Sequence, residues 1–396
     1  MKVPRLLSIY PESQSIMKSW QDIHAIIFNK LSIVTSLSES IDLSIYYYTV
    51  YKTFEHEQDL AHAQRFFVQG LTYIVSSSRP IWDVDSILDL TGIAQLTHWF
   101  AKNKQPFIKA EELLAAADSQ LLTQAQQLLV DHQATQKRFF FRILRYFQLR
   151  LPASGIAATL NRLFEQAQLA DDNHKWTLLL PIRSEPKEGL TILGLGDGLA
   201  GEALQLIRLY KAGIQQPILL KAIKARILAI LATRREVDFS EGIYSMFPDA
   251  ITSDTDQIRD SQELTWRGGD LGQALLLYEA CMLLQDEELA WLAELVGLNT
   301  LLRKEEGMTS VHTSAFYTGA AGIAHLYYQL HRISGNPAYE AGHRYWVGKI
   351  QRFLPQDIAS GLYERQSGLR YDLTSMASTL LAAVTAQPIE REQRLW

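Results

Sequence analysis

The chain has 396 residues, of which 47% are hydrophobic and 20% charged, with a formal net charge of -5 at pH 7. This composition excludes disordered and fibrous proteins and supplies enough apolar residues for a large core. The mild negative charge, without any block of basic residues, excludes nucleic acid as an expected partner. The single cysteine, Cys281, excludes an internal disulfide and limits any metal site to one thiolate.

The N-terminal stretch MKVPRLLSIYPESQ has only a short apolar run before Pro11 and Glu12, so no signal peptide is predicted. No run approaches the roughly 18 apolar residues that a membrane-spanning helix needs. We therefore expect a cytoplasmic protein with no transmembrane segment.

Residues 1 to 40 are expected to form an N-terminal helical segment, because their aliphatic residues recur at partly helical spacing. A short motif of small residues then recurs along the chain, and each copy runs into an apolar stretch with helical spacing. A second amphipathic stretch usually follows, so each repeat is expected to be a helical hairpin. The copies of the motif begin at Tyr46, Asp89, Pro152, Gly198, Gly269, Gly319 and Asp372.

The two helices of each expected hairpin differ in character. The first is apolar on most faces, as in IAATLNRLF and QALLLYEACMLL, whereas the second carries charge on one face, as in KAIKARILAILATRR. This contrast indicates seven inner helices enclosed by seven outer helices. The sequence therefore predicts an all-α fold, an (α/α)7 toroid, as a single domain over residues 1–396 with its seven repeats at about 41–390. An open solenoid is the alternative.

Glycines and histidines in this pattern have simple structural interpretations. The paired glycines of the motifs at 198–201, 269–272 and 319–322 are expected to let helices and loops approach closely rather than to bind a ligand. The histidines of the last two hairpins lie 13, 6 and 12 residues apart, which does not place pairs on one helical face. They are expected to be ordinary core or surface residues, namely His312, His325, His331 and His343.

The order GLGDGLAG, TWRGGDLG and FYTGAAG resembles the three signature blocks of the lanthionine synthetase C (LanC-like) family, the cyclases of lanthipeptide biosynthesis. The resemblance extends from about residue 40 to the end. It implies a double ring of seven inner and seven outer helices, with a zinc ion held by two cysteines and a histidine. In that family the zinc lowers the pKa of a substrate cysteine, whose thiolate adds to dehydroalanine or dehydrobutyrine to close a thioether ring.

The zinc ligands implied by the resemblance are missing from this sequence. Arg267 stands where the family has its first cysteine, and Tyr317 and Thr318 stand where it has the second cysteine and the histidine. Arginine is always charged and would repel a cation. We therefore interpret the chain as a degenerate member with no metal ligands and no cofactor, the family's zinc being absent.

The acid and base positions also differ. Asp197 corresponds to a family histidine, Glu263 to an arginine, and Gln148 to an acidic residue. We expect the guanidinium of Arg267 to pair with Asp197 or Glu263 and to fill the space of the metal. The candidate catalytic residues are Asp197, Arg267 and Glu263, and the candidate substrate-binding residues are Trp266, Tyr317, Thr318, Gln148 and Asp270.

Two functions follow from the resemblance. The first is a zinc-free, non-catalytic homologue that binds the dehydrated precursor peptide or its modifying partner, a lanthipeptide dehydratase, with aromatic residues such as Trp266 holding the peptide. The second is a zinc-independent cyclase. In that version Asp197 is the base, Arg267 stabilises the thiolate or the enolate, and positioning supplies part of the rate.

A third function remains open, because closed helical toroids also include glycoside hydrolases, which work with two carboxylates. Such a pair could come from Asp197, Glu202, Glu263 and Asp270, with Trp266 as a platform for the sugar. For Glu202 and Asp270, however, the simpler interpretation is that acids at helix starts are favoured by the helix dipole.

Overall fold

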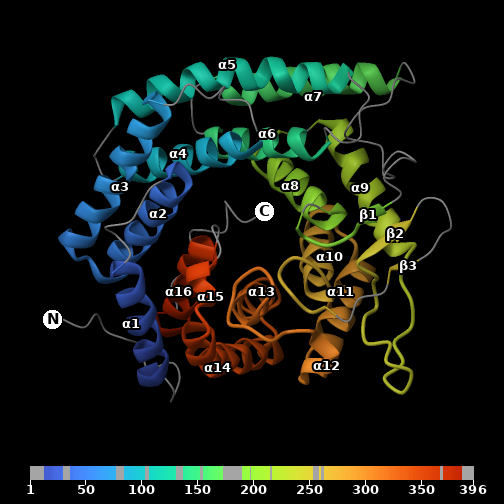
Figure 1. Ribbon diagram of the computed structural model, residues 1–396. Helices are drawn as coiled ribbons and strands as arrows, with labels where there is room; N and C mark the ends of the chain where they lie inside the picture. Colours follow the sequence, from blue (N-terminus) through green and yellow to red (C-terminus); the bar gives the residue numbers. More distant parts are fainter. Residues whose placement is uncertain are drawn as a thin grey trace. The chain divides into compact units, whose positions relative to one another are not determined.

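The computed structural model describes residues 13–29, 36–76, 84–102, 107–130, 137–151, 155–172, 190–196, 198–214, 216–252, 258–259, 263–365 and 369–385. Almost all of their regular structure is helical (Figure 1). The chain divides into two compact units. The first unit contains residues 1–80, 95–106 and 311–395, and the second contains residues 81–94 and 107–310. Helix α4, Val84–Lys102, contributes residues to both.

In the first unit, helices that are neighbours in sequence pack as hairpins, α2 against α3 and α13 against α14. Its helices are α1 (Ser13–Asn29), α2 (Leu37–Phe54), α3 (Glu57–Ser76), α13 (Ala320–Ser334), α14 (Pro337–Ala359), α15 (Leu362–Arg365) and α16 (Leu369–Thr385).

The second unit contains the hairpins α8–α9 and α10–α11, with α8 packed against α10. Its helices are α5 (Ile108–Val130), α6 (Lys137–Arg150), α7 (Ile156–Asp172), α8 (Leu199–Lys211), α9 (Pro217–Leu231), α10 (Asp270–Leu284), α11 (Glu287–Thr300) and α12 (Glu306–Thr309). It also contains an antiparallel sheet in the order β1-β2-β3, made of β1 (Leu190–Ile192), β2 (Ala250–Thr252) and β3 (Ile258–Arg259).

Burial separates the long helices into two kinds, as the sequence predicts. Among the described residues, the helices with few or no exposed positions along most of their length are α2, α4, α6, α8, α10, α13 and α16. The helices that bury one face and expose the other are α1, α3, α5, α7, α9, α11 and α14. The predicted contrast between buried inner helices and amphipathic outer helices is therefore confirmed. In the part of the chain that is described, no helix has the length and apolarity to cross a bilayer.

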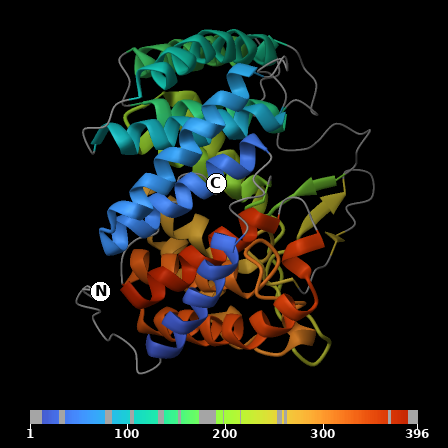
Figure 2. The same ribbon diagram turned by 60° about the vertical axis from the view of Figure 1, so that its left-hand side comes forward.

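The N-terminal helix belongs to the repeat pattern rather than preceding it. Helix α1 buries one face, formed by Ile16, Trp20, Ile23 and Ile27, and packs along α16 (Figure 2). The last buried helix is thus covered by the first helix of the chain. Sequence periodicity treats residues 1–40 as a separate segment, because it carries no information about pairing between the two ends of a chain.

Three of the predicted helix starts are correct and three are wrong. Helices α8, α10 and α13 begin directly after Gly198, Gly269 and Gly319. In contrast, three other motif copies lie inside helices, at Tyr46, Asp89 and Asp372. The copy at Pro152 lies outside the described residues.

The physical reason is that the hydroxyl groups of serine and threonine can form hydrogen bonds with backbone carbonyls inside a helix. The hydroxyl of Thr91 donates to the carbonyl of Ile87 at 2.6 Å, and that of Ser378 donates to the carbonyl of Thr374 at 2.8 Å. Such bonds to the preceding turn remove the cost of burying a hydroxyl, so Ser and Thr need not mark a helix end.

Helix α7, expected from IAATLNRLF to be a buried inner helix, is an amphipathic outer one. It packs against α5 and α9 and leaves Leu169 62% exposed. The buried position of this repeat is taken by α6, although this helix contains several basic residues. Its Arg150 is buried nonetheless, because the guanidinium binds Asp118 at 2.9 Å and Glu111 at 3.1 Å on α5.

Replacing Tyr146 by Phe tests how α6 is held on α5. The phenol donates to Asp118 Oδ1 at 2.6 Å, and both burial and that carboxylate raise the pKa of Tyr146, which keeps it a donor. Tyr146→Phe should lower the free energy of unfolding by about 1–2 kcal/mol, measured by urea denaturation. Tyr210→Phe, at a half-buried tyrosine of α8, is the control. Equal stability of the two variants would contradict this role.

Candidate functional site

Two glycine-rich loops of the second unit lie against each other at the starts of α8 and α10. The amide of Gly196 donates to the carbonyl of Arg267 at 2.9 Å. A Cβ atom on Gly194 would lie 2.5 Å from that carbonyl oxygen, and one on Gly196 would lie 2.6 Å from Cγ of Arg267. Only residues without a side chain fit at this approach. The glycines therefore let Arg267, on the loop before α10, lie in direct contact with the loop that precedes α8.

Glycines also bring α8 and α10 together. A Cβ atom on Gly201 would lie 2.2 Å from the carbonyl oxygen of Leu195, and one on Gly272 would lie 2.5 Å from Cγ of the same leucine. Leu195 is therefore enclosed between the first turns of the two helices. These distances agree with the predicted packing role of the motif glycines.

The loop before α10 is a tight turn that exposes one side chain and buries its neighbour. The amide of Thr265 donates to the carbonyl of Gly268 at 3.1 Å, and the amide of Gly268 donates to Oγ1 of Thr265 at 3.2 Å. Glu263 is half-buried and accepts from the hydroxyl of Thr265 at 3.3 Å. As a result Trp266 is only 5% exposed, whereas Arg267 is exposed.

The predicted partners of Arg267 have different outcomes. Asp197 lies outside the described residues, so its pairing with Arg267 stays a prediction. Within the described part of the chain, no ion pair joins Arg267 to Glu263. A further carboxylate, that of Asp249, has Oδ1 3.3 Å from the place of a Cβ on Gly268. No sequence motif points to Asp249, because this residue reaches the loop through the pairing of β2, which it precedes, with β1.

Asp270 anchors the loop that follows α9 and is not accessible. Its side chain is fully buried and accepts the amides of Met246 at 2.9 Å and Phe247 at 3.1 Å, while Arg303 lies 3.8 Å away. Burial raises the pKa of Asp270 to about 6, although Arg303 and the two amides act in the opposite direction. The contact with a substrate predicted for Asp270 would require this loop to open.

The carboxylate of Glu202 forms ion pairs with two residues of the second unit. It binds the fully buried Arg226 at 2.8 Å and Lys137 at 2.9 Å. Burial lowers the pKa of Lys137, whereas the charge of Glu202 raises it. Glu202 and Asp270 are thus both occupied by internal partners. They do not form the accessible pair of carboxylates that a glycoside hydrolase needs.

The other candidates belong to different units. Tyr317 and Thr318 belong to the loop before α13 in the first unit, where Tyr317 is half-buried with its ring 5.7 Å from Phe316 and Thr318 is exposed. That loop is held by Asp357, which accepts the amide of Ser314 at 2.6 Å. Gln148 is half-buried on α6 in the second unit.

The residues at the family's ligand positions do not fit zinc. A guanidinium is a permanent cation without a metal-binding lone pair, and the hydroxyls of Tyr317 and Thr318 are not the thiolate and imidazole that zinc prefers. Among the residues that the structure describes, no group of three or more His, Cys, Asp or Glu side chains is arranged to hold a metal ion. His343 instead lies with Nδ1 2.8 Å from the carbonyl of Ala324. The predicted absence of zinc stays a prediction.

Comparisons with known proteins agree with this architecture. No family model matches the sequence, and a search of curated proteins finds no match. Among solved structures, the chain is similar to a nisin cyclase, with a TM-score of 0.63 and 13% sequence identity over 96% of each chain. This likeness shows that the chain has the predicted α/α toroid fold of that cyclase.

Proposed function

We propose that this protein acts in lanthipeptide biosynthesis as a zinc-free homologue of the cyclases that binds a dehydrated precursor peptide or the dehydratase that modifies it. The observation that carries the proposal is the exposed Arg267, seated on the glycine loops at the start of α8 in a chain with the fold of a nisin cyclase. A guanidinium offers five donors to peptide carbonyls and carboxylates, which a zinc site does not.

A zinc-free cyclase is the second candidate, favoured by the same exposed cation. A guanidinium next to a substrate cysteine would lower the pKa of its thiol. The thiolate would add to Cβ of a dehydroamino acid, forming the carbon–sulfur bond. The displaced electron pair would form an enolate, which then takes a proton at Cα. Asp197 is the residue proposed to move that proton.

Peptide binding by the purified protein tests the proposal. The probe is a fluorescent synthetic peptide that contains dehydroalanine and cysteine, and the measurement is fluorescence anisotropy. Arg267→Ala should weaken binding about tenfold, the loss expected for hydrogen bonds to a charged group. Arg234→Ala removes another exposed arginine of the second unit and should leave binding unchanged. Equal affinities of these two variants would contradict the role of Arg267.

Metal content and thiol consumption separate the two candidates. Stoichiometric zinc in the purified protein would overturn the zinc-free proposal. Thiol loss no faster than in buffer, together with binding, would support the non-catalytic role. Metal-free ring closure that Asp197→Asn abolishes would favour the cyclase instead.

A further inference from the structure

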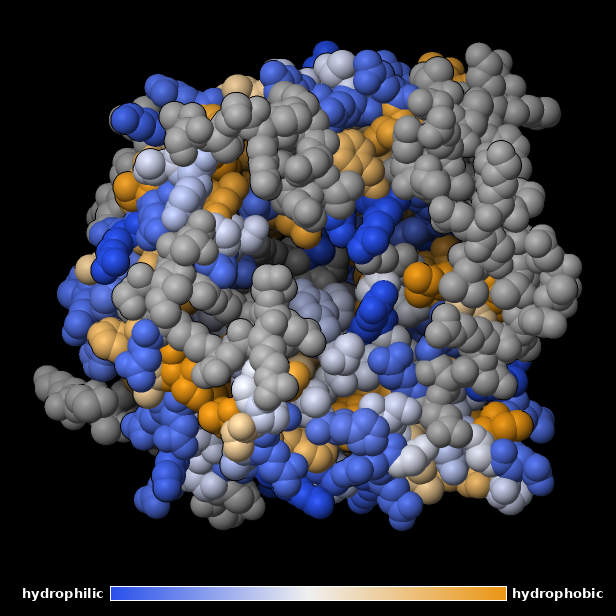
Figure 3. Space-filling view, in the orientation of Figure 1, coloured by the Kyte–Doolittle hydropathy of each residue, from blue (hydrophilic) through white to orange (hydrophobic). Residues whose placement is uncertain are grey.

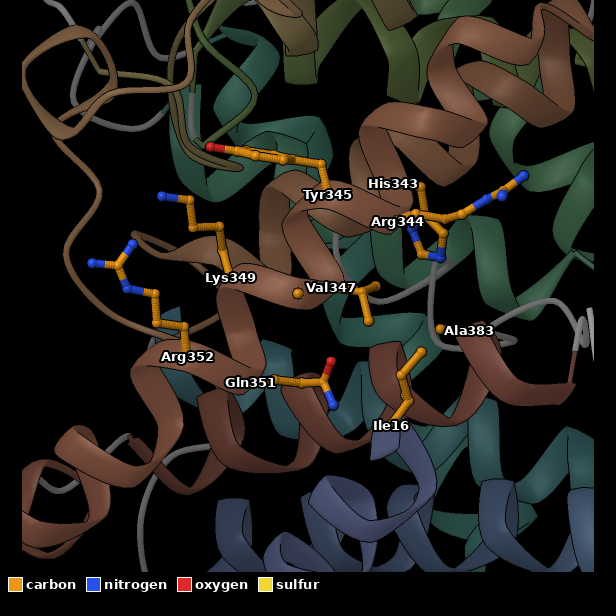
Figure 4. Close-up of a pocket in the computed structure, with 10 residues that line it drawn as sticks. Ile16, His343, Arg344, Tyr345, Val347, Lys349, Gln351, Arg352 and Ala383 are labelled. Carbon is orange, nitrogen blue, oxygen red and sulfur yellow. The ribbon is translucent and has the colours of Figure 1, made fainter. Parts of the chain in front are cut away.

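A groove of 430 Å³ lies on α14 in the first unit, bordered by α1 and the end of α16 (Figure 4). One end of it is lined by apolar side chains of three helices, Ile16 from α1, Val347 from α14 and Ala383 from α16. Gln351 closes one side by donating to the hydroxyl of Ser15 at 2.7 Å, which ties α14 to α1. The volume is that of a site for a few side chains of a ligand.

The walls of the groove are basic. Lys349 and Arg352 point in the same direction, with Tyr345 beside them, whereas Arg344 points the other way (Figure 4). Arg344 is paired with Glu340 at 2.8 Å. Among the described residues Lys349 and Arg352 form no ion pair, and no described residue that lines the groove is acidic. Two positive charges are thus available to a ligand.

An aromatic surface and a bare stretch of helix complete the groove. The ammonium of Lys349 lies 5.5 Å from the ring centre of Tyr345 and 5.9 Å from that of Phe353, which positions the charge beside apolar surface. Gly348 precedes Lys349 on the same helix, and a Cβ atom there would meet nothing within 4 Å. Glycine inside a helix is about 1 kcal/mol less favourable than alanine, so the open space over Gly348 is accompanied by a loss of helix stability.

We propose that this groove binds an acidic peptide segment of a partner protein. Two carboxylates of the segment pair with Lys349 and Arg352, and an apolar side chain passes over Gly348 toward the apolar end. A groove with an apolar end accommodates a peptide segment better than it accommodates the flat surface of an anionic membrane. Hydrophilic residues predominate in the part of Figure 3 where Figure 1 draws α14. The groove belongs to the first unit and Arg267 to the second, so either proposal can fail alone.

The test measures anisotropy of a short labelled peptide rich in Glu and Leu, which lacks cysteine and dehydroalanine. We expect saturable binding that weakens in high salt and disappears when Gln replaces Glu. Lys349→Glu with Arg352→Glu should weaken binding at least about tenfold. The matched control, Lys52→Glu with Lys224→Glu, makes the same charge change at exposed residues elsewhere and should leave affinity unaltered.

Gly348→Leu fills the groove without changing charge and should also abolish binding. Thermal unfolding should show this variant at least as stable as the parent, because the added side chain has room and leucine favours the helix. Equal weakening by the two double variants, or full binding by Gly348→Leu, would overturn the proposal. Binding to vesicles that contain phosphatidylserine, with none to the peptide, would overturn it as well.

Discussion

Asp270→Ala should lower the free energy of unfolding by about 3–5 kcal/mol, because it leaves a buried arginine without its carboxylate. Asp270 and Arg303 are both fully buried at 3.8 Å. The carboxylate also accepts the amides of Met246 and Phe247, which lose their partner in the variant. Urea denaturation followed by circular dichroism measures the change.

The control for this variant is Glu236→Ala, which removes an exposed acid from the same unit and should change stability by less than about 0.5 kcal/mol. Similar values for the two variants would mean that Asp270 does not hold the loop after α9.

The pH dependence of this effect has a defined sign. Burial raises the pKa of Asp270 from 3.8 to about 6, so the folded protein holds this proton more tightly than the unfolded chain. The contribution of the group to stability is therefore complete below pH 4 and declines as pH rises to about 6. Asp270→Asn keeps the side chain neutral at every pH. Its cost relative to the parent should accordingly shrink between pH 4 and pH 6.

Gly269→Ala should destabilise the protein by about 3 kcal/mol or more, since it combines backbone strain with a steric clash. Gly269 has φ 96°, which side chains rarely tolerate, and its Cβ would lie 2.4 Å from the carbonyl oxygen of Glu263. The turn that presents Arg267 would have to open. The same variant should therefore lose peptide affinity as well as stability.

Gly307→Ala is the matched control for Gly269→Ala, because its Cβ would meet nothing within 4 Å in the same unit. Thermal unfolding should place this control within about 0.5 kcal/mol of the parent. A Gly269 variant as stable as this control would show that the turn has another low-energy conformation.

The first turns of α8, α10 and α13 could be located from the sequence because the close approach of nearby backbone requires glycine there. Gly198, Gly269 and Gly319 all sit where a chain segment passes within 3 Å of the place of a Cβ. The resemblance in these motifs also pointed to the correct fold, which the likeness to a nisin cyclase shows. It singled out Arg267 as well, and the structure places that residue exposed on the loop.

The sequence by itself determined the helical class, the repeat and the contrast between buried and amphipathic helices, because these depend on the spacing of apolar residues along one helix. Only the tertiary structure decided that α1 covers α16, that α6 rather than α7 is buried, and that Asp270 faces Arg303. Each of these depends on a partner far away in the chain, which changes the cost of burying a charge or an apolar face. Periodicity carries no information about such partners.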